Sequence, residues 1–191
     1  MTRRRKCPLA APLLTAVLIV GPSACAAGPV AGSSAATAPL TGSAVPAVTG
    51  TTADGHRVDA ARRAVLLAFV DFTGGLGSPS RSQLVVLKSA ATQHAGDALV
   101  LAVDGTGRAS DDELVNAAND WDLGRAGVAV LGKASGAAAA AVYRPATVPE
   151  TVLVTSGGII AERWGGLTPA QRIVPALHDL LSPVPAPTSR S

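Results

Sequence analysis

Two uninterrupted apolar segments, residues 64–70 and 98–103, constrain the fold of this chain more than any other feature. Strands buried on both faces produce such runs, and sheets covered by helices are built from them. The segment between the two runs, residues 80–94, has Leu84, Leu87 and Ala91 at helical spacing. A buried strand, a helix and a second buried strand predict an α/β domain with helices on both faces of its sheet.

The rest of the chain continues this alternation. Asp54-Gly55 predicts a hairpin turn between residues 48–52 and 56–58. Ser110-Asp111-Asp112-Glu113 predicts a capping box that opens a helix through Trp121. The further elements are a strand at 128–131, an Ala-rich helix to Tyr143, a hairpin of 151–154 with 159–164, and a last helix opened by Thr168-Pro169 and ending at Leu181. After a leading hairpin, the predicted order is βαβαβαββα, which implies a mixed sheet.

Residues 1–25 predict an export signal. Arg3 to Lys6 are positively charged, residues 8–20 are apolar but too short to span a bilayer, and small residues follow. Two modes of cleavage are compatible with this pattern. Ser23-Ala24-Cys25 resembles the end of a bacterial lipobox, in which Cys25 is lipidated, whereas cleavage after Ala24-Cys25-Ala26 would release the protein. We expect an exported protein, either lipid-anchored on the outer face of the cytoplasmic membrane or secreted.

The chain divides into a tether, one domain and a tail. Residues 26–46 are uncharged and consist of Ala, Gly, Ser, Thr, Pro, Val and Leu, which predicts a flexible tether. Residues 47–181 are long enough for one folded core. Residues 182–191 contain three prolines and predict a disordered tail. We expect a monomer.

Charge argues against a nucleic-acid partner. The chain has 16 basic and 13 acidic residues, a net charge of +3. Four of the basic residues, Arg3 to Lys6, lie in the export signal, and the remainder is close to neutral. Nucleic-acid binding requires a basic face on the folded domain. We therefore expect no nucleic-acid partner. A near-neutral domain also has no basic face for a membrane surface, so we expect contact with a membrane through the lipid anchor only.

Cysteine and histidine positions limit the possible chemistry. The two cysteines are Cys7 and Cys25, so residues 26–191 contain none. The domain can form no internal disulfide, thiolate nucleophile or cysteine-ligated metal site. His56, His94 and His178 are scattered, with no second ligand at metal-binding spacing. The sequence predicts neither a metal site nor a cofactor.

Three motifs carry a resemblance to a known family. Residues 70–81, Val-Asp-Phe-Thr-Gly-Gly-Leu-Gly-Ser-Pro-Ser-Arg, resemble the thioredoxin segment V-D-F-W-A-E-W-C-G-P-C-K. Residues 148–154, Val-Pro-Glu-Thr-Val-Leu-Val, resemble its V-P-T-T-F-L-I loop, and residues 157–160 resemble its D-G-R-I hairpin. Over residues 47–181 the layout is most similar to redoxins, which are exported thiol-disulfide oxidoreductases and peroxiredoxin-like proteins. The resemblance implies a thioredoxin-like three-layer α/β sandwich with an N-terminal β-hairpin extension and a cis bond before Pro149.

The chain differs from that family at the residues that carry out the family's redox reaction. Its C-G-P-C motif reads Gly77-Ser78-Pro79-Ser80 here, with Gly77 in place of the nucleophilic cysteine and Ser80 in place of the resolving one. Dithiol exchange requires a thiolate and a second thiol. We therefore assign no catalytic residue, and chemistry of the family type is excluded at this site unless a partner supplies both sulfurs.

Three polar residues around this motif each have two interpretations. The resemblance implies that Asp71 is a buried carboxylate that assists proton transfer; without a thiol it is either a residual acid/base group or a polar residue satisfied by hydroxyls or water. Ser78 and Ser80 lie near a predicted helix start, where they either help to bind an anion or a carbonyl group or cap the helix.

The resemblance also implies a groove for an extended peptide beside the cis-proline. Its residues here are Ser78, Thr147, Val148 and Pro149, and backbone pairing in such a groove does not depend on cysteine. In the alternative, Pro149 only shapes a turn. Two function hypotheses follow: a non-catalytic module that binds a peptide or an envelope protein, or an oxidoreductase by descent with residual or partner-dependent activity.

Overall fold

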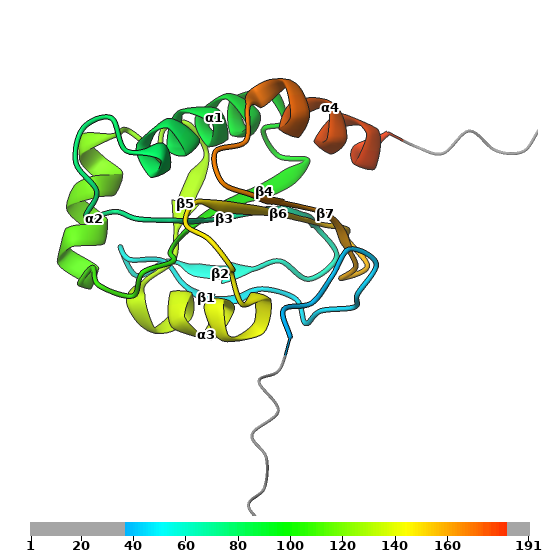
Figure 1. Ribbon diagram of the computed structural model, residues 1–191, viewed down its shortest axis with the longest axis horizontal. Coiled ribbons are helices and arrows are strands. Elements are labelled where there is room, and N and C mark those ends of the chain that lie inside the picture. The colour runs from blue at the N-terminus through cyan, green and yellow to red at the C-terminus, as the bar shows by residue number, and fades with distance from the viewer. Residues whose placement is uncertain (1–36, 183–191) are drawn as a thin grey trace, which may run out of the picture. The chain divides into compact units, whose positions relative to one another are not determined.

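The central sheet has five strands in the order β5-β4-β3-β6-β7, in a computed structural model that describes residues 37–182 (Figure 1). The strands are β3 (Ala64–Val70), β4 (Ala98–Asp104), β5 (Val128–Val130), β6 (Glu150–Val154) and β7 (Ile160–Gly165). Strands β3, β4 and β5 run parallel, whereas β6 is antiparallel to both β3 and β7. The sheet is therefore mixed, as predicted.

Helices and a small hairpin cover the two faces of this sheet (Figure 1). Helices α1 (Pro79–Gln93) and α4 (Ala170–Leu181) pack on one face. Helix α3 (Lys133–Tyr143) and the hairpin of β1 (Thr49–Thr51) and β2 (Arg57–Asp59) pack on the other. Helix α2 (Asp111–Asp120) lies beside β5 at the sheet edge. The three layers and the N-terminal hairpin confirm the predicted fold class and element order.

Strand β3 lies at the centre of two hydrophobic cores. All seven of its residues are buried, because helices cover both faces and β4 and β6 flank it. On one face, Leu66 and Val70 pack in a cluster with Leu87 of α1. On the other face, Leu67 and Phe69 pack in a cluster with Tyr143 at the end of α3 and with the hairpin. Side-chain alternation along a strand thus assigns its residues to two different cores.

One helix start agrees with the sequence prediction and one differs. Ser110 and Glu113 form the predicted reciprocal capping box of α2. The expectation that Thr168 caps the last helix is wrong, because α4 begins at Ala170 and its N-cap residue is Pro169, without a side-chain cap. The backbone N–H of Thr168 instead donates to the Oε1 of buried Gln83 in α1, at 2.8 Å. Thr168 thereby joins the start of α4 to the neighbouring helix.

Residues 40–45, which the sequence assigned to the tether, make backbone hydrogen bonds with the domain. Gly42 N–H donates to the carbonyl of Ile160, and Val45 N–H donates to that of Gly158. Backbone pairing of this kind needs no charged or bulky side chain, so composition gives little sign of it. The predicted export signal, Cys25 and residues 183–191 of the predicted tail lie outside the described residues. Within residues 37–182, no helix is long and apolar enough to cross a membrane.

Candidate functional site

The loop between β3 and α1 holds the residues that resemble the thioredoxin motif. Ser78 is the N-cap of α1: its Oγ accepts a hydrogen bond from the backbone N–H of Arg81 at 3.2 Å, and Pro79 occupies the first helical position. Gly77 has a φ of +85°, a left-handed conformation that favours glycine. No heavy atom lies within 4 Å of the position that a Gly77 Cβ would occupy. The capping interpretation of Ser78 is confirmed.

Ser80 has a different role from Ser78. Its side chain is buried, and its Oγ accepts a hydrogen bond from the backbone N–H of Asp71 at 2.9 Å. This bond joins the first turn of α1 to the residue that follows β3. Because the hydroxyl points into the protein and has this partner, Ser80 does not contribute to an anion site at the surface.

Asp71 is partly exposed, so the expectation of a buried carboxylate is wrong. Its Oδ1 accepts hydrogen bonds from the N–H and hydroxyl of Thr73, at 2.9 and 2.7 Å. Its Oδ2 forms an ion pair with Arg108 at 2.9 Å. The hydrogen bond from the Thr73 hydroxyl, helped by backbone N–H groups and the charge of Arg108, holds the pKa of Asp71 below its ordinary value. Asp71 is therefore a fixed anion at neutral pH rather than a group that exchanges protons.

The loop before β6 contains the predicted cis-proline. The Val148–Pro149 peptide bond is cis, which confirms the expectation from the resemblance. The hydroxyl of Thr147 donates to the carbonyl of Pro149 at 3.2 Å, and Gly166 N–H donates to the same carbonyl at 2.8 Å. Val148 packs closely on Gly105, where an added Cβ would lie 2.9 Å from Val148 Cγ2. Glycine at 105 lets the loop approach the end of β4.

The strand register brings three loops to one end of the sheet. Phe69 near the end of β3 pairs with Glu150 at the start of β6, and Glu150 pairs with Gly165 at the end of β7. The loops that follow β3, precede β6 and follow β7 therefore adjoin. Each carries an exposed apolar side chain: Leu76 is 84% exposed, Val148 37% and Leu167 51%. We call the surface formed by Leu76, Gly77, Ser78, Thr147, Val148, Pro149 and Leu167 the motif surface.

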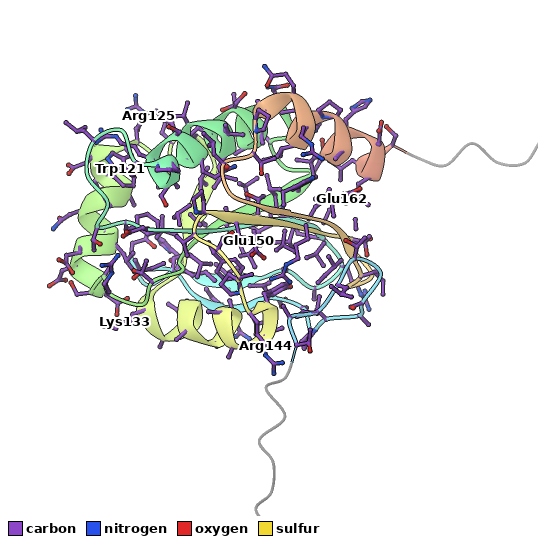
Figure 2. All side chains as sticks on the ribbon, viewed as in Figure 1. Trp121, Arg125, Lys133, Arg144, Glu150 and Glu162 are labelled. Carbon is purple, nitrogen blue, oxygen red and sulfur yellow. The ribbon has the colours of Figure 1, made fainter. Side chains whose placement is uncertain are left out.

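A buried ion pair lies beneath the motif surface, and the sequence reasoning missed it. Glu150 is only 2% exposed and lies in the interior of the molecule (Figure 2). Its Oε1 is 2.5 Å from Nη2 of Arg163 on β7, and its Oε2 accepts hydrogen bonds from the N–H groups of Ala146 and Thr147. The sequence did contain a signal for this ion pair. Glu150 stands at the start of a mostly apolar strand, and a charge buried there needs a partner of opposite charge.

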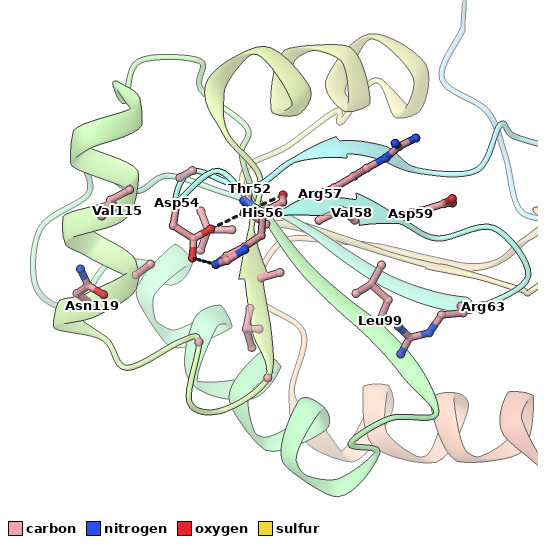
Figure 3. Close-up of a pocket in the computed structure, with 17 residues that line it drawn as sticks. Thr52, Asp54, His56, Arg57, Val58, Asp59, Arg63, Leu99, Val115 and Asn119 are labelled. Atoms are coloured by element: carbon pink, nitrogen blue, oxygen red, sulfur yellow. Dashed lines mark hydrogen bonds and ion pairs between the residues drawn. The ribbon is translucent and has the colours of Figure 1, made fainter.

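A recess of about 450 Å³ lies elsewhere, between the β1–β2 turn, α2 and β5 (Figure 3). None of the predicted site residues lines it. At one end Asp54 lies 3.7 Å from His56, with both side chains well exposed, and Arg63 and Leu99 lie toward the other end (Figure 3). Among residues 37–182, no three His, Cys, Asp or Glu side chains are close enough together to hold a metal ion.

Comparisons with known proteins identify the fold. No protein-family model matches the sequence, and no curated protein gives a significant sequence match. Solved structures do match. The thioredoxin domain of a thiol-disulfide oxidoreductase from Bacteroides vulgatus is 17% identical, with a TM-score of 0.56, over 75% of this chain and 99% of that chain.

Two further structures give the same result. The exposed lipoprotein thioredoxin of Streptococcus pneumoniae strain TIGR4 is 19% identical, with a TM-score of 0.55, over 71% of this chain and 100% of its own. A thioredoxin-family thiol:disulfide interchange protein from Chlorobium tepidum TLS is 13% identical, with a TM-score of 0.55, over 76% of this chain and 100% of its own. The chain therefore has a thioredoxin-like fold, as the resemblance implied.

Proposed function

We propose that this chain is an exported thioredoxin-like domain that binds an extended peptide or a loop of an envelope protein at the motif surface, without thiol chemistry. One observation carries the proposal: the three adjoining loops at the cis-proline end of the sheet each carry an exposed apolar side chain, Leu76, Val148 and Leu167, in a domain whose residues 26–191 contain no cysteine. Apolar side chains gathered around a polar backbone segment are typical of a protein-binding surface.

The backbone of Val148 supports an extended ligand. Within residues 37–182, neither the N–H nor the C=O of Val148 has a hydrogen-bond partner. An extended peptide satisfies such a donor and acceptor by pairing as an added strand. The main-chain pairing would supply affinity, and contacts with Leu76 and Leu167 would supply selectivity. With glycine and serine at the cysteine positions, the surface is small, and we expect dissociation constants in the micromolar range or weaker, about −8 kcal/mol at most.

A second function remains open, that of an oxidoreductase by descent. The structures that this chain resembles include proteins named thiol-disulfide oxidoreductases. Activity at Gly77 and Ser80 would need a partner that supplies both sulfurs, because neither residue offers a thiol. The binding proposal needs no such partner, and for this reason we place it first.

Export and anchoring complete the proposal. Residues 1–25 carry the export signal, and Cys25 is the proposed lipidation site. One structure with the same fold is named an exposed lipoprotein. A tether after Cys25 would hold the domain at the outer face of the cytoplasmic membrane, where partners in the cell envelope are within reach.

The test is peptide binding with two matched glycine variants. Peptides selected on the chain from a displayed random library are titrated against the wild type, Gly75→Trp and Gly124→Trp. Both glycines have open space at the Cβ position and neither has a left-handed φ, so a side chain can start from either position without a Cβ clash or backbone strain. Gly75 lies beside Leu76, whereas Gly124 lines the recess of Figure 3. Loss of binding in Gly75→Trp alone supports the proposal; loss in Gly124→Trp alone, or no selectable peptide, contradicts it.

A further inference from the structure

Arg163 contacts three separate parts of the chain from within β7. Its Nη2 lies 2.5 Å from Glu150 Oε1 and donates to the backbone carbonyls of Tyr143 and Arg144 at 2.8 and 2.9 Å. Its Nη1 donates to the carbonyl of Pro39 at 2.8 Å. A guanidinium group can do this because it carries a positive charge and five N–H donors in a planar fork. Arg163 thereby joins β6, the end of α3 and the segment before β1.

The segment that reaches Arg163 is seated along the β6–β7 hairpin. We call residues 39–45 the strap. Gly42 N–H donates to the carbonyl of Ile160 at 2.8 Å, and Ile160 N–H donates to that of Ser43 at 3.0 Å. Val45 N–H donates to the carbonyl of Gly158 at 2.7 Å, and its side chain packs against the core. These bonds fix the segment whose Pro39 carbonyl accepts the hydrogen bond from Arg163 Nη1.

Glu150 links this assembly to the motif surface. Its Oε2 accepts hydrogen bonds from the N–H of Ala146 at 2.8 Å and from that of Thr147 at 3.3 Å. These are the two N–H groups that come just before Val148, the residue proposed to pair with a peptide. Hydrogen bonds to a buried carboxylate are stronger than those between neutral groups. Its other oxygen, Oε1, has the ion pair with Arg163 as its polar contact and accepts no hydrogen bond within residues 37–182.

We infer that Arg163 is a positioning residue for the motif surface and that the strap controls it. A seated strap fixes Arg163, which fixes Glu150 and hence the backbone of Ala146 and Thr147. Displacement of the strap, which leads toward the proposed anchor at Cys25, loosens that backbone. The consequence for binding rests on the proposed function, whereas the coupling itself does not. By linkage, a peptide bound at Val148 tightens the strap in return.

Amide hydrogen exchange in the full chain tests the coupling without any ligand. Val45→Pro removes one strap hydrogen bond and alters the packing of the Val45 side chain, both within the strap, and leaves Arg163 and Glu150 themselves unchanged. We expect the amides of Ala146 and Thr147 to exchange about fivefold faster or more, which is the lower end of typical coupling between sites. Ala47→Pro is the matched control, because Ala47 is exposed and its N–H donates no hydrogen bond in the structure. Central sheet amides such as Phe69 should not change in either variant.

Arg163→Lys gives a second test, since lysine keeps the charge but has no planar fork. It should accelerate the same two amides; if it does not fold, Val45→Pro alone decides. Unchanged exchange at Ala146 and Thr147 in folded Val45→Pro overturns the coupling. A peptide selected on the wild type should bind Val45→Pro at least about fivefold more weakly and should slow exchange at Val45.

These readouts separate the two proposals. Faster exchange with unchanged peptide affinity overturns the role of Arg163 in binding. Faster exchange in a chain that binds no peptide leaves the coupling intact and contradicts the proposed function instead.

Discussion

The hydroxyl of Ser80 accepts a hydrogen bond from the backbone N–H of Asp71 at 2.9 Å, and this bond joins α1 to the end of β3. Ser80 is buried at the position where the resemblance places a resolving cysteine. The serine is therefore part of the framework that holds the loop carrying Leu76, Gly77 and Ser78. Ser80 provides a structural hydrogen bond at the position where the C-G-P-C motif has a reactive cysteine.

Replacement of Ser80 by alanine should destabilise the domain. The substitution leaves the Asp71 N–H without its partner near the protein interior, and such a loss costs about 1–3 kcal/mol. Ser156→Ala is a suitable control, because Ser156 is exposed in the β6–β7 turn and has no side-chain hydrogen bond in the structure. Urea denaturation of both variants gives the difference. A Ser80→Ala midpoint equal to that of the control would show that the bond contributes nothing.

The double change Gly77→Cys and Ser80→Cys should restore a dithiol that forms a disulfide. Cysteine at position 77 has room, but its φ of +85° is left-handed, which costs about 1–2 kcal/mol. The pair should nevertheless close, because the two residues flank the same helix start as in the C-G-P-C motif that this segment resembles. The measurement is thiol content by mass spectrometry after mild oxidation, with Cys7 and Cys25 replaced by serine. A folded double variant that stays reduced would mean that the motif is misaligned.

The unmodified chain should neither reduce insulin disulfides nor consume peroxide through a thiol. The reason is that no cysteine lies between residues 26 and 191. Turnover is measured with protein free of contaminating thioredoxin, with the reduced Gly77→Cys and Ser80→Cys double variant, which carries a dithiol, measured for comparison. Turnover by the wild type above the buffer rate would favour the oxidoreductase hypothesis.

The hydrogen bonds from Thr73 to Asp71, together with the ion pair to Arg108, should make stability depend on pH in the acid range. The pKa of Asp71 is lower in the folded state than its ordinary value, so the folded form holds the proton less tightly. The stabilisation is therefore fully present above the unfolded pKa of about 3.9 and is lost as pH falls through the lower folded value. A partly exposed pair of this kind contributes about 0.2–1 kcal/mol.

Asp71→Asn removes this contribution. Its unfolding free energy should lie below that of the wild type at neutral pH and should approach it at the lowest pH at which both proteins fold. Denaturant titrations across this range provide the measurement. If the difference in unfolding free energy between the wild type and Asp71→Asn grew as pH falls, the result would contradict a lowered pKa of Asp71 in the folded state.

The fold could be predicted from the sequence because its main signals are local. Residues 64–70 and 98–103 are apolar without interruption, and both became central strands at nearly those bounds. Ser110 and Glu113 mark the start of α2 through a four-residue pattern. Such patterns involve only residues close together in the sequence, so they can be recognised without knowing which strands pair.

The features that sequence reasoning missed depend on tertiary pairing. Glu150 and Arg163 meet because β6 and β7 pair in one register, with Arg163 opposite Val152, two residues from Glu150. Thr168 lies one residue before the N-cap Pro169, and its N–H donates to buried Gln83, which is far away in sequence. Asp71 is paired at the surface with Arg108, which the loop that follows β4 brings to it from 37 positions along the chain.

Mapping of a selected peptide by backbone amide chemical shifts, under fully reducing conditions, tests the central claim most directly. The account predicts shifts that cluster on the motif surface, at Leu76, Gly77, Ser78, Val148 and Leu167, with no dependence on reductant. Residues around the recess of Figure 3, such as Asn119 and Gly124, should not shift. Shifts that cluster at that recess, or binding that requires an oxidant, would contradict a thiol-independent peptide site beside Pro149.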